Sequence, residues 1–151
     1  MWMAVGKPMK EILGKTDSGY REWLEGKAGQ IASYGKFAFR ELATLGDWPG
    51  IKAAAVRTEC PAVNAEYAAD ILIENKQEKL AVQVAIETPY RQVTWHVADT
   101  LTKKGLGRPH VVDITRGIED DKFAISVLGA LEGWEIRERR RARANLPKRQ
   151  D

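Results

Sequence analysis

Two polar side chains, a carboxylate and an amide, stand in apolar stretches near the middle of the sequence, and together they could form part of a catalytic site. Asp70 lies in the run from residue 67 to 74, and Gln83 lies in the run from residue 79 to 87. The second run alternates in apolar character, as a half-buried strand does, which places Ala81 and Gln83 on its open face. If the two runs pair through the polar turn between them, Asp70 and Gln83 lie on one side of a sheet, within about 8 Å. The site would then offer one carboxylate and one amide.

The elements that would position this pair follow from the pattern of apolar residues. A helical pattern runs from residue 19 to 45, with glycines that allow two helices or a kinked one. After it the sequence predicts strands over residues 51–60, 67–74 and 79–87, a helix over 90–104, a strand over 110–115 and a helix over 120–134. No internal repeat is visible. This order predicts an α/β fold with a mixed central sheet, whose first three strands form a meander, flanked by helices.

This order and several short motifs resemble the PD-(D/E)XK nuclease superfamily and, within it, the nuclease-like domain of CoiA-type competence proteins. The matching positions, within roughly residues 55–115, are Glu59, Ala69-Asp70, Gln83, Arg91 and Trp95. The resemblance implies a restriction-endonuclease-like core and Mg²⁺-dependent hydrolysis of phosphodiester bonds. It also implies that Asp70 binds the metal ion and that Gln83 positions the attacking water or a phosphate.

The sequence departs from that family at three positions. The family's metal-binding glutamate falls on Ala81, its serine on Ala85, and the arginine before its Ala-Asp pair on Ala68. Mg²⁺ prefers oxygen ligands in near-octahedral geometry and usually takes one or two carboxylates, so Asp70 alone would hold it weakly. Catalysis is therefore expected to be impaired in this sequence, whether Ala81 is natural or a deliberate substitution.

Basic residues are concentrated in one segment. The whole sequence of 151 residues carries a formal net charge of +3. Residues 136–151 contain the acids Glu138 and Asp151 and seven basic residues, Arg137, Arg139, Arg140, Arg141, Arg143, Lys148 and Arg149. A basic tail (136–151) on a near-neutral domain (1–135) predicts contact with a polyanion. We expect these side chains, together with Arg91, to bind nucleic acid, with DNA favoured.

Composition limits other kinds of site. The single cysteine, Cys60, excludes an internal disulfide, and two histidines, His96 and His110, give no basis for a zinc site. Neither histidine has a partner at helical or strand spacing, so both are expected to be structural. The sequence shows no signal peptide and no run of membrane-spanning length, which predicts a cytoplasmic protein.

Two other interpretations stay open at this point. Ala81 and the small size fit a non-catalytic interaction protein, such as a phage- or plasmid-encoded inhibitor or regulator that binds protein or DNA. A compact basic nuclease also fits a secreted bacterial toxin domain, although the sequence carries no signature of one.

Overall fold

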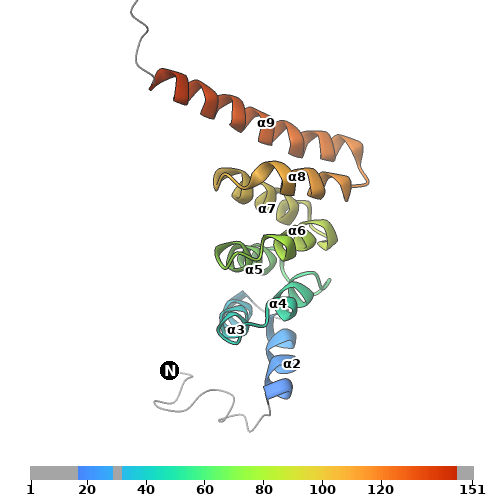
Figure 1. Ribbon diagram of the computed structural model, residues 1–151. Coiled ribbons are helices and arrows are strands. Elements are labelled where there is room, and N and C mark those ends of the chain that lie inside the picture. The colour runs from blue at the N-terminus through green and yellow to red at the C-terminus, as the bar shows by residue number, and fades with distance from the viewer. Residues whose placement is uncertain (1–16, 29–31, 146–151) are drawn as a thin grey trace, which may run out of the picture.

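The computed structural model describes residues 17–28 and 32–145, which form helices joined by short turns (Figure 1). The helices are α2 (Asp17–Ala28), α3 (Ala32–Thr44), α4 (Trp48–Ala55), α5 (Ala62–Glu74), α6 (Glu78–Glu87), α7 (Arg91–Lys103), α8 (Gly107–Arg116) and α9 (Asp121–Ala144). These described residues contain no strand. None of their helices is long and apolar enough to cross a lipid bilayer.

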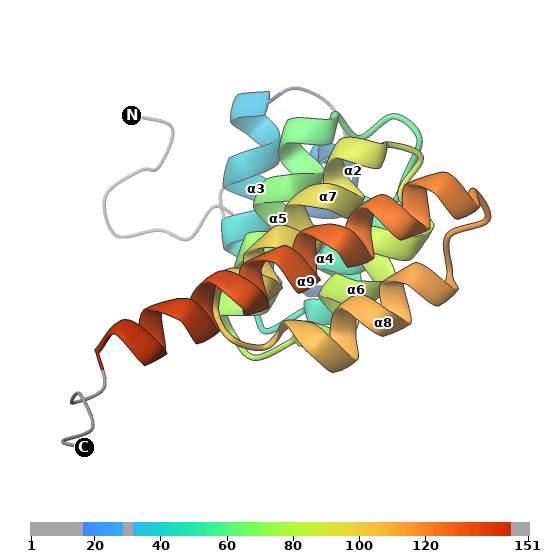
Figure 2. The ribbon, with the colours of Figure 1, turned by 90° about the horizontal axis from the view of Figure 1, so that it is seen from above.

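The helices form two layers. α2, α4, α6 and α8 follow one another in one layer, and α3, α5, α7 and α9 do so in the other. Each helix contacts the next helix of its own layer and its chain neighbours in the other layer. Figures 1 and 2 show the resulting stack, with α2 and α3 near one end and α9 across the other. This is the arrangement of an α-solenoid, in which stacked helix pairs bury a continuous core between the layers.

The stack repeats about every 30 residues along the chain. A leucine occupies the same place in the second helix of each pair, and none of the four is more than 3% exposed: Leu42, Leu72, Leu101 and Leu131. Four residues before each leucine stands another buried apolar residue: Ala38, Ala68, Val97 and Val127. The expectation that the chain has no internal repeat is therefore wrong. The repeat is faint in the sequence because the helix pairs share few residues beyond these core positions.

The same turn ends the second helix of three successive pairs. Gly46, Lys76 and Gly105 follow α3, α5 and α7 with φ angles of 69°, 61° and 74°. After α5, the amide of Lys76 donates to the carbonyl of Ile73 (3.2 Å), and the amide of Gln77 donates to that of Leu72 (2.8 Å). This pair of hydrogen bonds is a Schellman motif, which satisfies the last carbonyl groups of a helix. The polar segment around Lys76 is thus a helix C-terminus, whereas the sequence predicted a hairpin turn.

The predicted α/β fold, with its restriction-endonuclease-like sheet, is wrong, and so is the resemblance to PD-(D/E)XK nucleases. Residues 79–87 lie in α6, whose buried side chains are Ala81, Val82, Val84 and Ala85. Ile86, which an alternating strand would place on the buried face opposite Ala81 and Gln83, is 38% exposed. Burial at i, i+1, i+3 and i+4 is a helical pattern. Over so short a segment the apolar residues matched a period of two as well as a period of 3.6, and the alternation was misleading.

The other predicted strands are helices for identifiable reasons. In α4, the Asp47 side chain accepts a hydrogen bond from the amide of Gly50 (3.2 Å), and Pro49 lies in the first turn, where it is tolerated. Three successive alanines then favour the helix. α5 contacts α3, α4, α6 and α7, so its continuous apolar run is buried on several sides. In α8, Val111 and Ile114 are buried at i, i+3. The helices predicted over residues 19–45, 90–104 and 120–134 are confirmed as α2 with α3, α7, and the first part of α9.

Candidate nucleic-acid interface

The three positions predicted to form a nuclease centre lie in different environments. Asp70 is half-buried on α5, Gln83 is exposed on α6, and Ala81 is completely buried on α6. Because the described residues form no sheet, the expected placement of Asp70 and Gln83 on one side of a sheet is wrong. The buried position of Ala81 also leaves no open cleft for the carboxylate that the resemblance placed there.

Asp70 instead contacts a histidine on the neighbouring helix of its layer. Its Oδ1 atom lies 2.7 Å from Nε2 of His96 on α7. This hydrogen bond raises the pKa of His96, and the charges of Asp70, Glu66 and Asp99 act in the same direction, against the effect of burial. The sequence shows no partner for His96 at helical or strand spacing, and Asp70, 26 positions away, is not at either spacing. Within the described ranges, no group of three or more His, Cys, Asp or Glu side chains is placed to hold a metal ion.

The start of α9 is firmly attached to α7. The Asp120 side chain accepts a hydrogen bond from the amide of Phe123 (3.1 Å) and binds Nη2 of Arg91 (2.7 Å). The amide hydrogen bond, and then the Arg91 guanidinium, hold the pKa of Asp120 below its usual range. Arg91 also lies 4.9 Å from the centre of the Phe123 ring, and Trp95 meets that ring edge-on at 6.2 Å. Arg91, expected to bind nucleic acid, is therefore engaged in joining these two helices.

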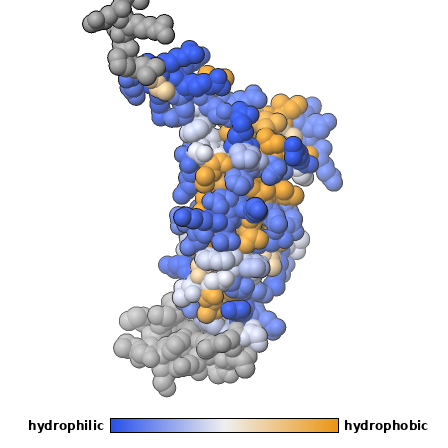
Figure 3. All heavy atoms as spheres, viewed as in Figure 1, coloured by the Kyte–Doolittle hydropathy of each residue, from blue (hydrophilic) through white to orange (hydrophobic). Residues whose placement is uncertain are grey.

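The second half of α9 leaves the stack. The buried residues of α9, Val127 and Leu131, lie in its first half, and Glu135 after them makes an ion pair with Arg108 of α8 (2.8 Å). Residues 136–144 continue the helix for about 13 Å and are exposed, apart from the half-buried Glu138. Figures 1 and 2 show this part projecting past the other helices, and Figure 3 shows it as mainly hydrophilic. The segment expected to be a separate basic tail thus begins as a continuation of a core helix.

One side of the projecting part carries arginines that have no acidic partner within residues 17–28 and 32–145. Arg139, Arg140 and Arg143 stand with Ile136 at i, i+3, i+4 and i+7 spacing and surround a surface hollow of about 230 Å³. We call these four residues the arginine face. Its arginines make no ion pair with any described residue.

The other predicted basic residues differ in their surroundings. Glu138, the acid of residues 136–144, pairs with Arg141 (3.1 Å). Arg137 points toward α7 and belongs to a separate groove. Lys148 and Arg149 lie outside the described residues.

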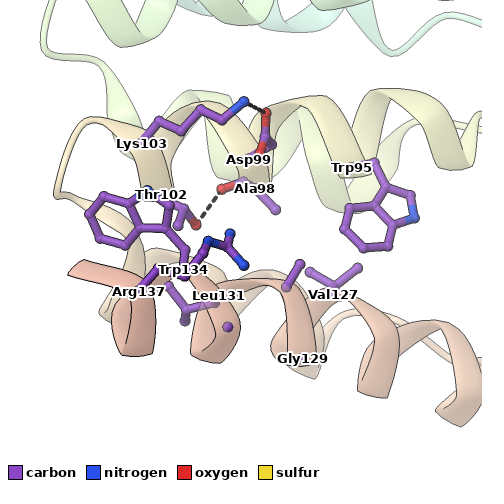
Figure 4. A pocket seen from close by; sticks show the side chains of 12 residues that line it. Trp95, Ala98, Asp99, Thr102, Lys103, Val127, Gly129, Leu131, Trp134 and Arg137 are labelled. Carbon is purple, nitrogen blue, oxygen red and sulfur yellow. Dashed lines mark hydrogen bonds and ion pairs between the residues drawn. The ribbon is translucent and has the colours of Figure 1, made fainter. Parts of the chain in front are cut away.

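A groove of about 290 Å³ runs between α7 and α9 (Figure 4). Trp95 and Trp134 lie near its two ends, and the Arg137 side chain points into it between them. Two glycines, Gly129 and Gly133, contribute to the α9 side. Sequence reasoning did not find this groove, although Gly129, Gly133 and Arg137 recur at i, i+4 and i+8 and so share a helix side.

Comparison of the chain with protein families, with curated proteins and with solved structures finds no match. The class of this protein is therefore described by its fold and its surface alone. The described residues form a stack of helix pairs in two layers whose last helix extends into a basic arm.

Proposed function

We propose that the protein binds nucleic acid through the arginine face of α9. The observation that carries the proposal is the placement of Arg139, Arg140 and Arg143 on one side of a projecting helix, exposed and without an acidic partner among the described residues. A guanidinium group can donate two parallel N–H hydrogen bonds to a phosphate, which makes arginine suited to polyanions. Bound phosphates would also relieve the repulsion among these neighbouring cations.

The helix dipole gives a structural explanation for only some of these arginines. Cations stabilise the negative C-terminal end of a helix, but the effect falls off beyond the last turn. Arg141 and Arg143 lie in that turn, whereas Arg139 and Arg140 precede it. Their presence on the same exposed side favours an external anionic partner. Contacts of this kind read the phosphate backbone and carry no base sequence information.

A charge-matched pair of triple variants tests the proposal. The test variant replaces Arg139, Arg140 and Arg143 with glutamine, which keeps a high helix propensity. The control removes the same charge at exposed basic residues elsewhere on the stack: Arg40→Gln, Lys79→Gln and Lys104→Gln. Binding of labelled duplex and single-stranded oligonucleotides is measured by fluorescence anisotropy at several salt concentrations. The test variant should bind more weakly, and its slope of log affinity against log salt should fall by about 2 to 3 for duplex DNA.

Two outcomes would contradict the proposal. If both variants lose the same affinity, net charge accounts for binding and the arginine face has no special role. If the unmodified protein binds no nucleic acid even at low salt, the non-catalytic interaction protein becomes the better account, with an acidic protein as the partner of this face.

A further inference from the structure

We infer that the groove between α7 and α9 binds one unpaired base of a single-stranded nucleic acid, an inference that rests on the proposed function. The aromatic and apolar side chains of the groove would receive the base, and the arginine face next to it would receive the neighbouring phosphates. α9 contributes residues to both the groove and the arginine face, so a single strand following α9 could contact both.

The groove has the lining that a flat aromatic ligand requires. Trp134 is half-buried and presents an indole at one end, while the buried side chains of Val127 and Leu131 on α9 and Ala98 on α7 form the apolar floor. Bases of any kind can stack on an aromatic side chain. A volume of about 290 Å³ lies at the lower limit for small-molecule sites, which favours one planar ring system over a larger ligand.

The two glycines keep the α9 side of the groove open. A Cβ atom added to Gly129 would have no heavy atom within 4 Å, and one added to Gly133 would meet only Nη1 of Arg137, at 3.5 Å. Packing within the described part of the chain therefore does not require glycine at either position. Glycine nevertheless lowers helix propensity relative to alanine. What the two glycines provide is exposed helix surface that a ring can approach closely.

The charges at the groove favour a nucleotide over a neutral aromatic ligand. Arg137 points into the groove and makes no ion pair with a described residue. At the rim, Lys103 and Asp99 neutralise each other through an ion pair of 2.9 Å. Arg137 therefore supplies the free positive charge, and Arg140 stands one helical turn further along α9. A base stacked within a duplex cannot present its face to a side chain, so the ligand must contain unpaired bases.

Three DNA probes of equal length separate base binding from phosphate binding: a single strand, its duplex, and an abasic single strand with the same phosphates. Trp134→Leu removes the stacking surface. Gly129→Leu fills the groove at a position where the fold has room and where leucine improves helix propensity. Trp48→Leu, at a half-buried tryptophan of α4, is the matched control. Thermal unfolding followed by circular dichroism shows that each variant is folded.

We expect Trp134→Leu and Gly129→Leu to weaken binding of the single strand by about 5- to 150-fold, the range for one stacked base. Binding of the abasic strand and of the duplex should stay unchanged, and Trp48→Leu should affect none of the probes. If the unmodified protein binds the abasic and the normal strand equally, the inference fails while the proposed function stands. The same holds if both groove variants bind the single strand normally. If the unmodified protein binds none of the probes, the proposed function fails as well.

Discussion

Lys76 occupies a position in the repeated turn that is better suited to glycine. Its φ angle of 61° lies in the left-handed region, where the two equivalent turns have Gly46 and Gly105. The Lys76 side chain is exposed and makes no ion pair with a described residue, so it contributes little that would offset the strain. We therefore expect Lys76→Gly to increase the free energy of unfolding.

The size of this expected increase in the free energy of unfolding follows from two opposing effects of glycine. A side chain in the left-handed region costs about 1–2 kcal/mol. Glycine removes that strain, but it makes the unfolded chain more flexible, which costs about 0.4–1 kcal/mol. The net expectation is a gain of about 0.5–1 kcal/mol. With a denaturant slope of about 1–3 kcal/mol per molar urea, the midpoint should rise by several tenths molar.

The other turns provide the reciprocal experiment. An added Cβ at Gly46 or Gly105 would have no heavy atom within 4 Å, so alanine at either position introduces the backbone strain without a steric clash. Gly46→Ala and Gly105→Ala should each lower the free energy of unfolding by about 0.5–1 kcal/mol. Gln83→Gly is the control, because Gln83 is exposed in the interior of α6, where glycine should cost about 1 kcal/mol.

Urea unfolding followed by circular dichroism measures all four variants under the same conditions. The reasoning requires opposite signs for Lys76→Gly and Gln83→Gly. A loss of stability of similar size in both would mean that Lys76 has helical backbone and that α5 continues into α6. The Schellman turn, and with it the repeat proposed for this region, would then be refuted.

Two further predictions test the core and its polar contact. Ala81→Glu should lower the free energy of unfolding by about 3–5 kcal/mol at pH 7, because it places a carboxylate in a fully buried position. The control Gln83→Glu, at an exposed position on the same helix, should change the free energy of unfolding by less than about 0.5 kcal/mol. Equal effects of the two substitutions in urea unfolding would contradict the orientation of α6. The pKa of His96 is raised by Asp70, so its contribution to stability is fully present below the unfolded value of about 6.5 and is lost as the pH rises through the folded value. His96→Gln should therefore destabilise the protein at pH 6 more than at pH 9, and a thermal-unfolding difference that does not change with pH would rule this out.

The parts of the fold that the sequence predicts correctly are those where only one period fits. In α7 the charged Asp99 stands between the buried residues Val97 and Leu101, at the position where an alternating strand would need another apolar residue on the same face. α6 has short apolar side chains at consecutive positions, so local pattern alone does not separate strand from helix. Tertiary burial determines that this segment is a helix, because α6 packs against α4, α5, α7 and α8. The resemblance to a nuclease family depended on the same ambiguous segments and failed with them.

The candidate site was predictable in composition but not in arrangement. A run of arginines with one acid indicates a polyanion partner whatever its conformation. Its division into the arginine face and the inward-pointing Arg137 depends on α9 continuing as a helix beyond Glu135. The contact between His96 and Asp70 could not be predicted because it joins residues 26 positions apart, a separation that becomes short only once the helix pairs are stacked.

The two halves of α9 have different physical tasks, and the sequence of the projecting half suits both helix formation and binding. The first half is held by core packing, through Val127 and Leu131. The second half has no such packing, so its helical structure depends on the intrinsic propensity of its residues, which are mainly arginine and alanine. The same arginines that would contact phosphate are good helix formers, and those in the last turn complement the helix dipole. The arginine face is therefore held in place before any ligand binds, which lowers the ordering cost of association. An arm that is preorganised in this way can bind a polyanion with few contacts.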